Sequence, residues 1–364
     1  MIDLFIAIGE PSGDLHGSRL IEELLFLRPN MKIGAIAGPK MRKLPIQEFF
    51  PMENLLVMGF IDVLLALPKI ILQFFAIRKK ILELNPKAVV LIDYPGFNLR
   101  LERSLRKKGY KGKLIHFICP TVWAWGKKRI PLMAENLDLL LTIFPFEKIC
   151  FENTQLPVQY VGHPLPQLVS EFKPQGKFKG KILGLFPGSR KTEIERNLPL
   201  QLKVARRLQK LDLSLQIAIS TTQFKLEIPD VLLVKPEDNY ELMRASHIAI
   251  ATSGTVTLEL ALHGTPTVVN FAIRPLDCFL AQKIFKINLP FYCIANIVVG
   301  QKVFPELFGP NLTEEQLFFW AQKLSEDQSA RKECLEGCQK VRKSLGLKRA
   351  AHEAAAVILS SLDF

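Results

Sequence analysis

Apolar and polar residues alternate along the chain in a pattern that predicts strands and helices in turn. Short apolar runs are followed by longer segments whose apolar residues recur at helical spacing, which is typical of βα units and a mostly parallel sheet. In the first half, strands are predicted at residues 4–8, 33–37, 88–92, 114–118, 139–143 and 158–161. Helices are predicted near 17–27, from Pro68 towards Leu84, and over 99–108. Pro68 can begin a helix because the first turn tolerates proline.

A polar, basic stretch over residues 170–181, which contains Pro174 and two glycines, interrupts this alternation. Such a composition marks a loop, so we predict a domain boundary at 170/171. The alternation then restarts, with strands predicted at 182–186, 215–220, 248–251 and 267–271 and helices near 193–211, 255–263 and after Thr313. The sequence therefore predicts an α/β chain of two Rossmann-like domains with parallel sheets and a ligand cleft between them.

Residues 9–14 (GEPSGD) directly follow the first predicted strand and open a helix. Gly9 and Gly13 let backbone N–H groups approach a ligand, and the start of a helix favours negative charge. The segment lacks the GxGxxG spacing of a dinucleotide site. An alternative is a tight turn in which Ser12 or Asp14 caps the helix.

Asp93 follows the predicted strand 88–92 and begins the segment DYPGFN. A carboxylate at the carboxyl end of a central strand is well placed to take a proton from an attacking hydroxyl. The alternative is a helix cap for a segment that begins near Asn98.

Two glycine turns in the second half predict a phosphate site. After strand 182–186, Gly188 and Ser189 can present backbone donors and Arg190 a forked charge, although Thr192 and Glu195 also fit a capped turn with a surface arginine. After strand 248–251, the amides of Gly254 and Thr255 can meet a second phosphate, and Ser253 can cap the helix. Glu259 could then accept hydrogen bonds from both ribose hydroxyls, so the two turns together favour a nucleoside diphosphate.

Each of the other candidate residues can be interpreted in two ways. Trp123 could stack on a sugar or belong to the core, and His163 could be structural or catalytic. The apolar segment 64–80, which ends in Arg78, Lys79 and Lys80, could lie in a membrane interface or form a core-facing helix of the sheet. Metal-ligand spacings are missing from the sequence, so we expect neither a metal nor another cofactor.

The formal net charge of +13 favours an anionic partner. We expect no nucleic acid, because the sequence has no zinc-finger, RNP or helix-turn-helix signature. The six cysteines form no paired CxxC pattern, and the start has no signal-peptide features, so we expect reduced thiols in a cytoplasmic protein.

The motifs, taken in order, resemble those of the lipid-A-disaccharide synthase family. The matching strings are GEPSGD at 9–14, AGPKM at 37–41, VMGF at 57–60, DYPGFN at 93–98, PTVWAW at 120–125, FPFE at 144–147, GHP at 162–164, PGSR at 187–190, SGT at 253–255 with Glu259, and PEL at 305–307. Each string is weak alone, but ten strings in register form a specific pattern.

The resemblance implies a GT-B fold and an inverting, metal-free transfer of 2,3-diacylglucosamine from UDP to 2,3-diacylglucosamine 1-phosphate (lipid X). It implies that Asp93 is the base and that Arg190, Ser253, Gly254, Thr255 and Glu259 hold UDP. Catalytic support is expected from Glu10 and Arg190, and further acceptor or other site contacts from Ser12, Gly13, Asp14, Asn98, Trp123, His163 and Asn296.

The same resemblance implies domains at 1–170 and 171–339, with helices at 340–364 returning to the first. Because both substrates are lipids, it implies a peripheral protein on the cytoplasmic face of the inner membrane, and family membership favours a homodimer. The alternatives are a UDP-GlcNAc-type epimerase, another UDP-sugar glycosyltransferase on this fold, or an inactive nucleotide-binding membrane scaffold.

Overall fold

The computed structural model describes residues 2–56, 60–221, 227–273 and 289–362, and only the backbone of residues 60–67. Residues 57–59 of the VMGF string therefore lie outside the described part. The chain divides into two compact units. Unit 1 runs to Pro164 and includes the chain from Lys348 onward, whereas unit 2 comprises Leu165–Leu347. These divisions lie a few residues from the predicted boundaries at 170/171 and 339/340.

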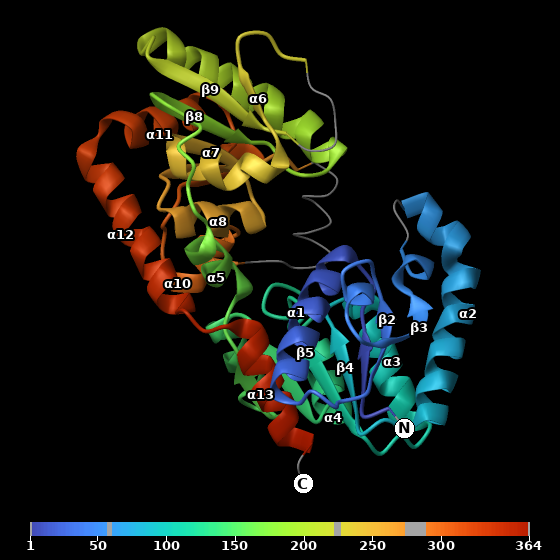
Figure 1. Ribbon diagram of the computed structural model, residues 1–364. Helices are drawn as coiled ribbons and strands as arrows, with labels where there is room; N and C mark the ends of the chain where they lie inside the picture. Colours follow the sequence, from blue (N-terminus) through green and yellow to red (C-terminus); the bar gives the residue numbers. More distant parts are fainter. Residues whose placement is uncertain (1, 57–59, 222–226, 274–288, 363–364) are drawn as a thin grey trace. The chain divides into compact units, whose positions relative to one another are not determined.

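Unit 1 contains a parallel sheet of seven strands in the order β3-β2-β1-β4-β5-β6-β7 (Figure 1). The strands are β1 (Leu4–Ala7), β2 (Ile33–Ala37), β3 (Gln47–Pro51), β4 (Ala88–Ile92), β5 (Lys113–Phe117), β6 (Leu139–Thr142) and β7 (Val158–Tyr160). Every side chain of β1 and β4 is buried, because both faces of the central strands are covered.

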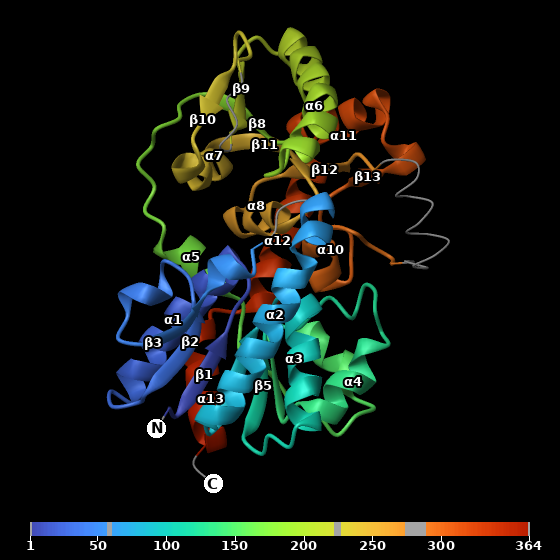
Figure 2. The ribbon, with the colours of Figure 1, turned by 90° about the vertical axis from the view of Figure 1, so that its right-hand side faces the viewer.

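Helices cover both faces of this sheet (Figure 2). One side carries α1 (Pro11–Leu27) and α13 (Ala350–Leu362), which pack against each other. The other side carries α2 (Phe60–Leu84), α3 (Pro95–Lys107) and α4 (Arg129–Asn136). The predicted start of a helix at Pro68 is wrong, because Pro68 lies inside α2. Proline removes only one N–H donor, and the apolar pattern continues through it at helical spacing.

Unit 2 repeats this plan with a parallel sheet in the order β10-β9-β8-β11-β12-β13. Its strands are β8 (Lys181–Phe186), β9 (Leu215–Ser220), β10 (Leu232–Val234), β11 (Ser246–Thr252), β12 (Thr267–Phe271) and β13 (Glu306–Phe308). Its helices are α6 (Lys191–Leu211), α7 (Asn239–Ala245), α8 (Thr255–His263), α10 (Ile294–Val299), α11 (Glu314–Glu326) and α12 (Gln328–Leu345). The helix α5 (Pro164–Glu171) begins at the division between the units. Both strand orders follow the doubly wound Rossmann pattern, which confirms the predicted α/β class.

Candidate active site

The candidate segments lie where the strand order of each sheet reverses. This switch point falls between β1 and β4 in unit 1 and between β8 and β11 in unit 2. Ligands of open α/β sheets bind beyond the carboxyl ends of the strands at such points. All four strand–turn–helix segments singled out in the sequence follow one of these four strands, so each unit brings two of them together.

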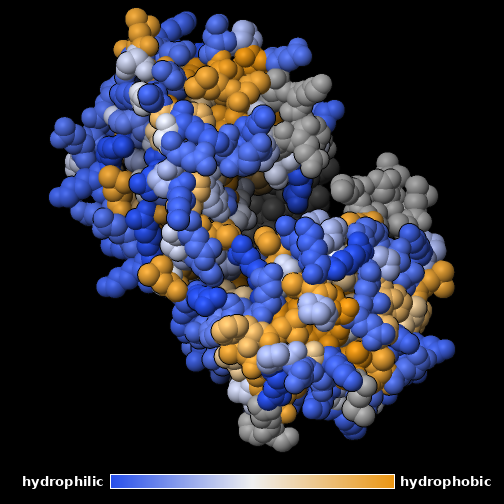
Figure 3. Space-filling view, in the orientation of Figure 1, coloured by the Kyte–Doolittle hydropathy of each residue, from blue (hydrophilic) through white to orange (hydrophobic). Residues whose placement is uncertain are grey.

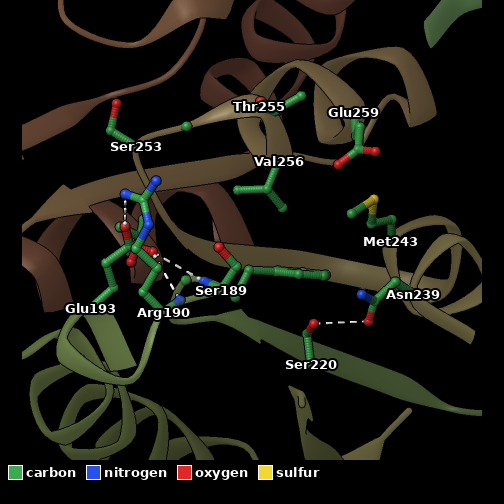
Figure 4. A pocket seen from close by; sticks show the side chains of 14 residues that line it. Ser189, Arg190, Glu193, Ser220, Asn239, Met243, Ser253, Thr255, Val256 and Glu259 are labelled. Carbon is green, nitrogen blue, oxygen red and sulfur yellow. Dashed lines mark hydrogen bonds and ion pairs between the residues drawn. The ribbon is translucent and has the colours of Figure 1, made fainter. Parts of the chain in front are cut away.

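The switch point of unit 2 holds a cavity of about 450 Å³ (Figure 4). It is lined by both glycine turns, the start of α6, the first turns of α8 and the start of α7. The lining residues are Phe186, Gly188, Ser189, Arg190, Glu193, Ser220, Asn239, Met243, Thr252, Ser253, Gly254, Thr255, Val256 and Glu259. All seven residues predicted to bind UDP are among them.

Glu193 forms hydrogen bonds with the first glycine turn that lines this cavity, at residues 188–190. Its Oε2 accepts hydrogen bonds from the backbone N–H of Ser189 (3.1 Å) and of Arg190 (3.3 Å), and its Oε1 accepts one from the Arg190 guanidinium (3.1 Å). Gly188 has φ +116°, and a Cβ there would lie 2.7 Å from that of Glu193, so the turn requires glycine. The predicted Thr192–Glu195 cap is wrong: the helix begins at Lys191, which places Glu193 where a carboxylate reaches the capping N–H.

The second turn presents the start of α8 to the same cavity. A Cβ on Gly254 would meet no atom within 4 Å, so a ligand can approach the backbone closely there. The first amides of a helix lack partners within the helix, and they favour negative charge together with the helix dipole. The Arg190 side chain is 81% exposed at the other turn, so a cation and backbone donors surround the same space.

Glu259 lies at the other end of this cavity from Arg190 (Figure 4). Burial raises the pKa of its carboxyl group, and the Tyr240 hydroxyl, which donates to Glu259 Oε1 over 3.1 Å, opposes that shift. Near it, the Ser220 hydroxyl donates to Asn239 Oδ1 over 2.8 Å. The cavity thus has a cationic end suited to phosphate and a hydroxyl-binding end suited to ribose.

The switch point of unit 1 gathers carboxylates instead. Glu10 ends the turn after β1, Asp93 follows β4, and the two carboxyl groups interact electrostatically. Burial, and then the charge of Glu10, raise the pKa of Asp93 to about 6. Glu147, in the 3-10 turn Pro145–Phe151 after β6, also interacts electrostatically with Asp93, and burial raises its pKa to about 8. A carboxylate of pKa about 6 is suited to general-base chemistry near neutral pH.

The backbone at Asp93 is left-handed, with φ +47° there and +49° at Tyr94. Side chains rarely adopt this conformation, so neighbouring contacts must stabilise it. The Tyr94 ring lies against Gly9, where a Cβ would fall 2.0 Å from it, and the Tyr94 hydroxyl donates to the Leu55 carbonyl over 3.0 Å. Gly9 therefore allows the two turns of this switch point to approach each other.

Several residues that were predicted to lie on the acceptor side form hydrogen bonds with the backbone. The Asp14 carboxylate is buried and accepts hydrogen bonds from the backbone N–H of Lys40 and Met41. Asn98 Nδ2 donates to the carbonyl groups of Ile92 and Asp93. In the α1 turn, the Ser12 hydroxyl donates to Glu10 Oε1 over 2.7 Å, and Gly13 packs on Ile8.

Both capping alternatives are wrong. Glu10, rather than Ser12 or Asp14, occupies the N-cap position of α1, without a side-chain capping hydrogen bond, and α3 begins at Pro95, three residues before Asn98. In unit 2, Asn296 is fully buried and bonds to the backbone of Val303 and Phe304, which ties α10 to the segment before β13.

Trp123 and His163 pack against Phe146 and Phe144, which precede Glu147 in the same turn. Trp123 packs edge-on against Phe146, with 5.4 Å between ring centroids, and its indole opposes the effect of burial on the pKa of Glu147. His163 packs on Phe144 at 4.8 Å, and burial lowers its pKa to about 3, so the imidazole is neutral at physiological pH. Glu147 and Glu193 were not predicted as site residues, although each lies three residues after a helix N-cap, where glutamate commonly reaches back to the cap.

The architecture of two Rossmann-like units is the GT-B fold. The solved structure of a putative UDP-N-acetylglucosamine 2-epimerase from Listeria monocytogenes shares it, with a TM-score of 0.66 at 13% identity over 100% of this chain and 97% of that one. A family model described as lipid-A-disaccharide synthetase matches residues 4–359, and this chain belongs to that family.

Curated lipid-A-disaccharide synthases are similar to the chain at the level of sequence. The Chlamydia pneumoniae protein is 40% identical over 84% of this chain and 53% of its own length. The Rhodospirillum centenum protein is 33% identical over 94% of this chain and 90% of its own length. The chain thus spans about half the length of the Chlamydia relatives it matches.

Proposed function

We propose that the chain is an inverting glycosyltransferase that makes the lipid A disaccharide. It transfers 2,3-diacylglucosamine from UDP-2,3-diacylglucosamine to the 6-hydroxyl of lipid X, giving a β-1,6-linked disaccharide 1-phosphate and UDP. The observation that carries the proposal is the buried Asp93 carboxyl at the unit 1 switch point, with its pKa raised to about 6. An inverting transfer needs one such base and a stabilised leaving group.

In the proposed reaction, Asp93 takes the proton of the acceptor hydroxyl while that oxygen attacks the anomeric carbon. The bond from this carbon to the diphosphate oxygen breaks on the opposite face, and UDP leaves with the electron pair. The Arg190 guanidinium and the backbone amides of Gly254 and Thr255 stabilise the departing diphosphate. Glu259 holds the ribose, and Glu10 assists Asp93 on the acceptor side.

We also propose that the protein is peripheral at the cytoplasmic face of the inner membrane. Helix α2 exposes Ile71, Leu72 and Phe75, and apolar atoms gather over it at the right of Figure 3. Within the described residues, none of the helices has the length and apolarity needed to cross a membrane. Exposed apolar side chains on a helix with cations at 78–80, in a chain of formal charge +13, favour adsorption to anionic lipid. A homodimer remains an expectation from the family.

The test is to incubate purified protein with both lipid substrates in detergent and a chelator, and to measure UDP and disaccharide by mass spectrometry. Asp93→Asn is assayed beside it, with Asp3→Asn as the matched control, because Asp3 directly precedes β1, at the amino ends of the strands and away from the switch point. We expect disaccharide from the wild type and from the control but almost none from folded Asp93→Asn. Interconversion of soluble UDP-GlcNAc without disaccharide would instead support an epimerase, and UDP binding without turnover would support a scaffold.

A further inference from the structure

A second cavity, in unit 1, lies between α3 and α4 and has no part in the reaction proposed above. Its volume is about 230 Å³, and Figure 2 shows the two helices that form it on the same face of the sheet. Pro95 lines it and follows Asp93 by two residues, a length of chain that spans at most about 7 Å, so the cavity lies close to the proposed base. Its lining combines three arginines with an apolar wall that includes Leu99, Leu132 and Met133.

The three arginines surround this cavity without carboxylate partners. Arg100 and Arg103 are neighbours on the surface of α3, three residues apart, and Arg129 begins α4. Within the described part of the chain, none of the three guanidinium groups forms an ion pair with a carboxylate. Glu102 also lines the cavity, but it is 1% exposed and hydrogen bonded to His116. Like charges gathered around one space repel one another, and a bound anion would relieve that repulsion.

Local contacts hold two of the arginines at the cavity. Arg100 Nη1 donates a hydrogen bond to the Gly96 carbonyl, one turn earlier in α3. The Arg129 guanidinium lies over the Trp125 ring, 4.4 Å from its centroid, and its buried Nη1 has no acceptor among the described residues. Each guanidinium carries five N–H donors, so both groups keep donors for a ligand, and their planar fork matches the oxygens of a phosphate.

Gly96 leaves the start of α3 open to the same cavity. Glycine is less favourable than alanine within a helix. Neither conformation nor crowding requires it here, because its φ is not left-handed and a Cβ would meet no atom within 4 Å. Its N–H lies in the first turn, where the helix itself offers no acceptor and negative charge is favoured. The missing side chain therefore gives an anion access to the backbone beside the arginines.

We infer that this cavity binds the phosphate of the acceptor sugar, with Arg100, Arg103 and Arg129 as its counter-charges. The inference rests on the proposed function, which pairs a phosphorylated acceptor with a base at Asp93. In that acceptor, the 1-phosphate and the attacking 6-hydroxyl lie on opposite sides of one sugar ring, so the phosphate site and the base must be close neighbours. The apolar wall suits the acyl groups of a lipid acceptor. The arginines are then specificity-determining residues, because an acceptor without phosphate leaves their charges uncompensated.

The inference is tested with two acceptors, lipid X and the same lipid without its 1-phosphate, in detergent free of phospholipid. The variant is Arg103→Gln, since this side chain is exposed and has no hydrogen bond or ion pair among the described residues. We expect kcat/KM to fall about tenfold for lipid X and less than about twofold for the acceptor without phosphate, because only the first loses a charged hydrogen bond. Lys107→Gln is the matched control, because it removes the same charge one turn further along α3, outside the cavity. An unchanged preference for lipid X in Arg103→Gln would overturn the inference.

A second measurement does not depend on turnover. Binding of glucosamine 1-phosphate is followed by the broadening of its ³¹P signal, with UDP at saturation to occupy the proposed phosphate site of unit 2. We expect broadening by wild type and Lys107→Gln but much less by Arg103→Gln, and this result in a protein that makes no disaccharide would defeat only the proposed reaction. The inference is wrong if all three proteins broaden the signal equally or if none does. Weaker sedimentation of Arg103→Gln with anionic vesicles, at an unchanged acceptor preference, would assign the arginines to membrane headgroups instead.

Discussion

Replacing Asp93 by asparagine should stabilise unit 1 above pH 6 while it removes activity. The Asp93 carboxyl is largely buried beside Glu10, and its pKa rises from 3.8 to about 6 on folding. Folding therefore opposes ionisation of this group. Asparagine has nearly the same shape and has no charge to bury.

The magnitude follows from proton linkage. Below pH 3.8 the carboxyl is protonated in both folded and unfolded chains, so it imposes no penalty. Between pH 3.8 and about 6 the unfolded state has lost this proton while the folded state keeps it, so stability falls across this range and stays lowered above it. Each pKa unit corresponds to about 1.4 kcal/mol, so the shift of about two units at Asp93 costs about 3 kcal/mol at pH 8. The Asp93→Asn variant is free of this cost, a gain on the order of 6–12 °C in Tm for a domain of this size.

The tryptophans allow this transition to be followed in unit 1 alone. Trp123 and Trp125 lie in unit 1 and Trp320 in unit 2, so Trp320→Phe leaves fluorescence that reports unit 1. Thermal unfolding is compared at pH 8 and pH 4 with and without Asp93→Asn in this background. Titrations of Glu147 and His163 are common to both proteins and largely cancel in the difference.

Asp3→Asn provides a control of opposite sign. Asp3 accepts a hydrogen bond from the Lys32 N–H and lies 3.4 Å from Lys87 Nζ, and the Lys32 bond lowers its pKa. Its contribution is present at neutral pH and is lost on acidification, so Asp3→Asn should lower the Tm at pH 8. Equal Tm values for wild type and Asp93→Asn at pH 8, with the control behaving as expected, would refute the assignment of a buried carboxyl with a raised pKa at position 93.

Four further outcomes are expected. Arg190→Ala should weaken UDP binding about 10- to 100-fold in calorimetry, because a hydrogen bond to a charged group contributes about 1.5–3 kcal/mol. Glu193→Gln keeps a hydrogen-bond acceptor for the turn but removes a negative charge that would repel the phosphates. UDP should therefore bind about threefold more tightly, or better, at low salt. Glu259→Gln should weaken binding of UDP but not of inorganic diphosphate, as measured in the same calorimeter. Leu72→Asp with Phe75→Asp should reduce sedimentation with anionic vesicles while turnover in detergent stays unchanged.

The fold was largely predictable because its central strands are buried on both faces. The runs at 33–37, 88–92, 215–220 and 267–271 coincide with β2, β4, β9 and β12, since a strand covered on both sides is continuously apolar. Edge strands β3, β10 and β13 were not predicted. Most of their residues are half-exposed or exposed, so neither a continuous apolar run nor a regular alternation marks them.

The candidate site was predictable where its chemistry is local in the sequence. A strand, a glycine turn and a helix start follow one another along the chain, and the switch-point rule then places them at the sheet edge. The contacts of Tyr94 with Gly9 and with the Leu55 carbonyl have no such signal, because they join residues that lie far apart in the sequence.

Several features of the structure around Asp93 lower the stability of the fold. A left-handed backbone at two successive residues, a buried carboxyl and a second carboxylate from Glu10 each carry a free-energy cost. The contacts of Gly9, Tyr94 and Asn98 hold this arrangement in place, and they would be superfluous around an ordinary turn. Because the substitution Asp93→Asn would relieve the electrostatic part of that cost at once, retention of an aspartate there is best explained by a proton that this carboxylate must accept.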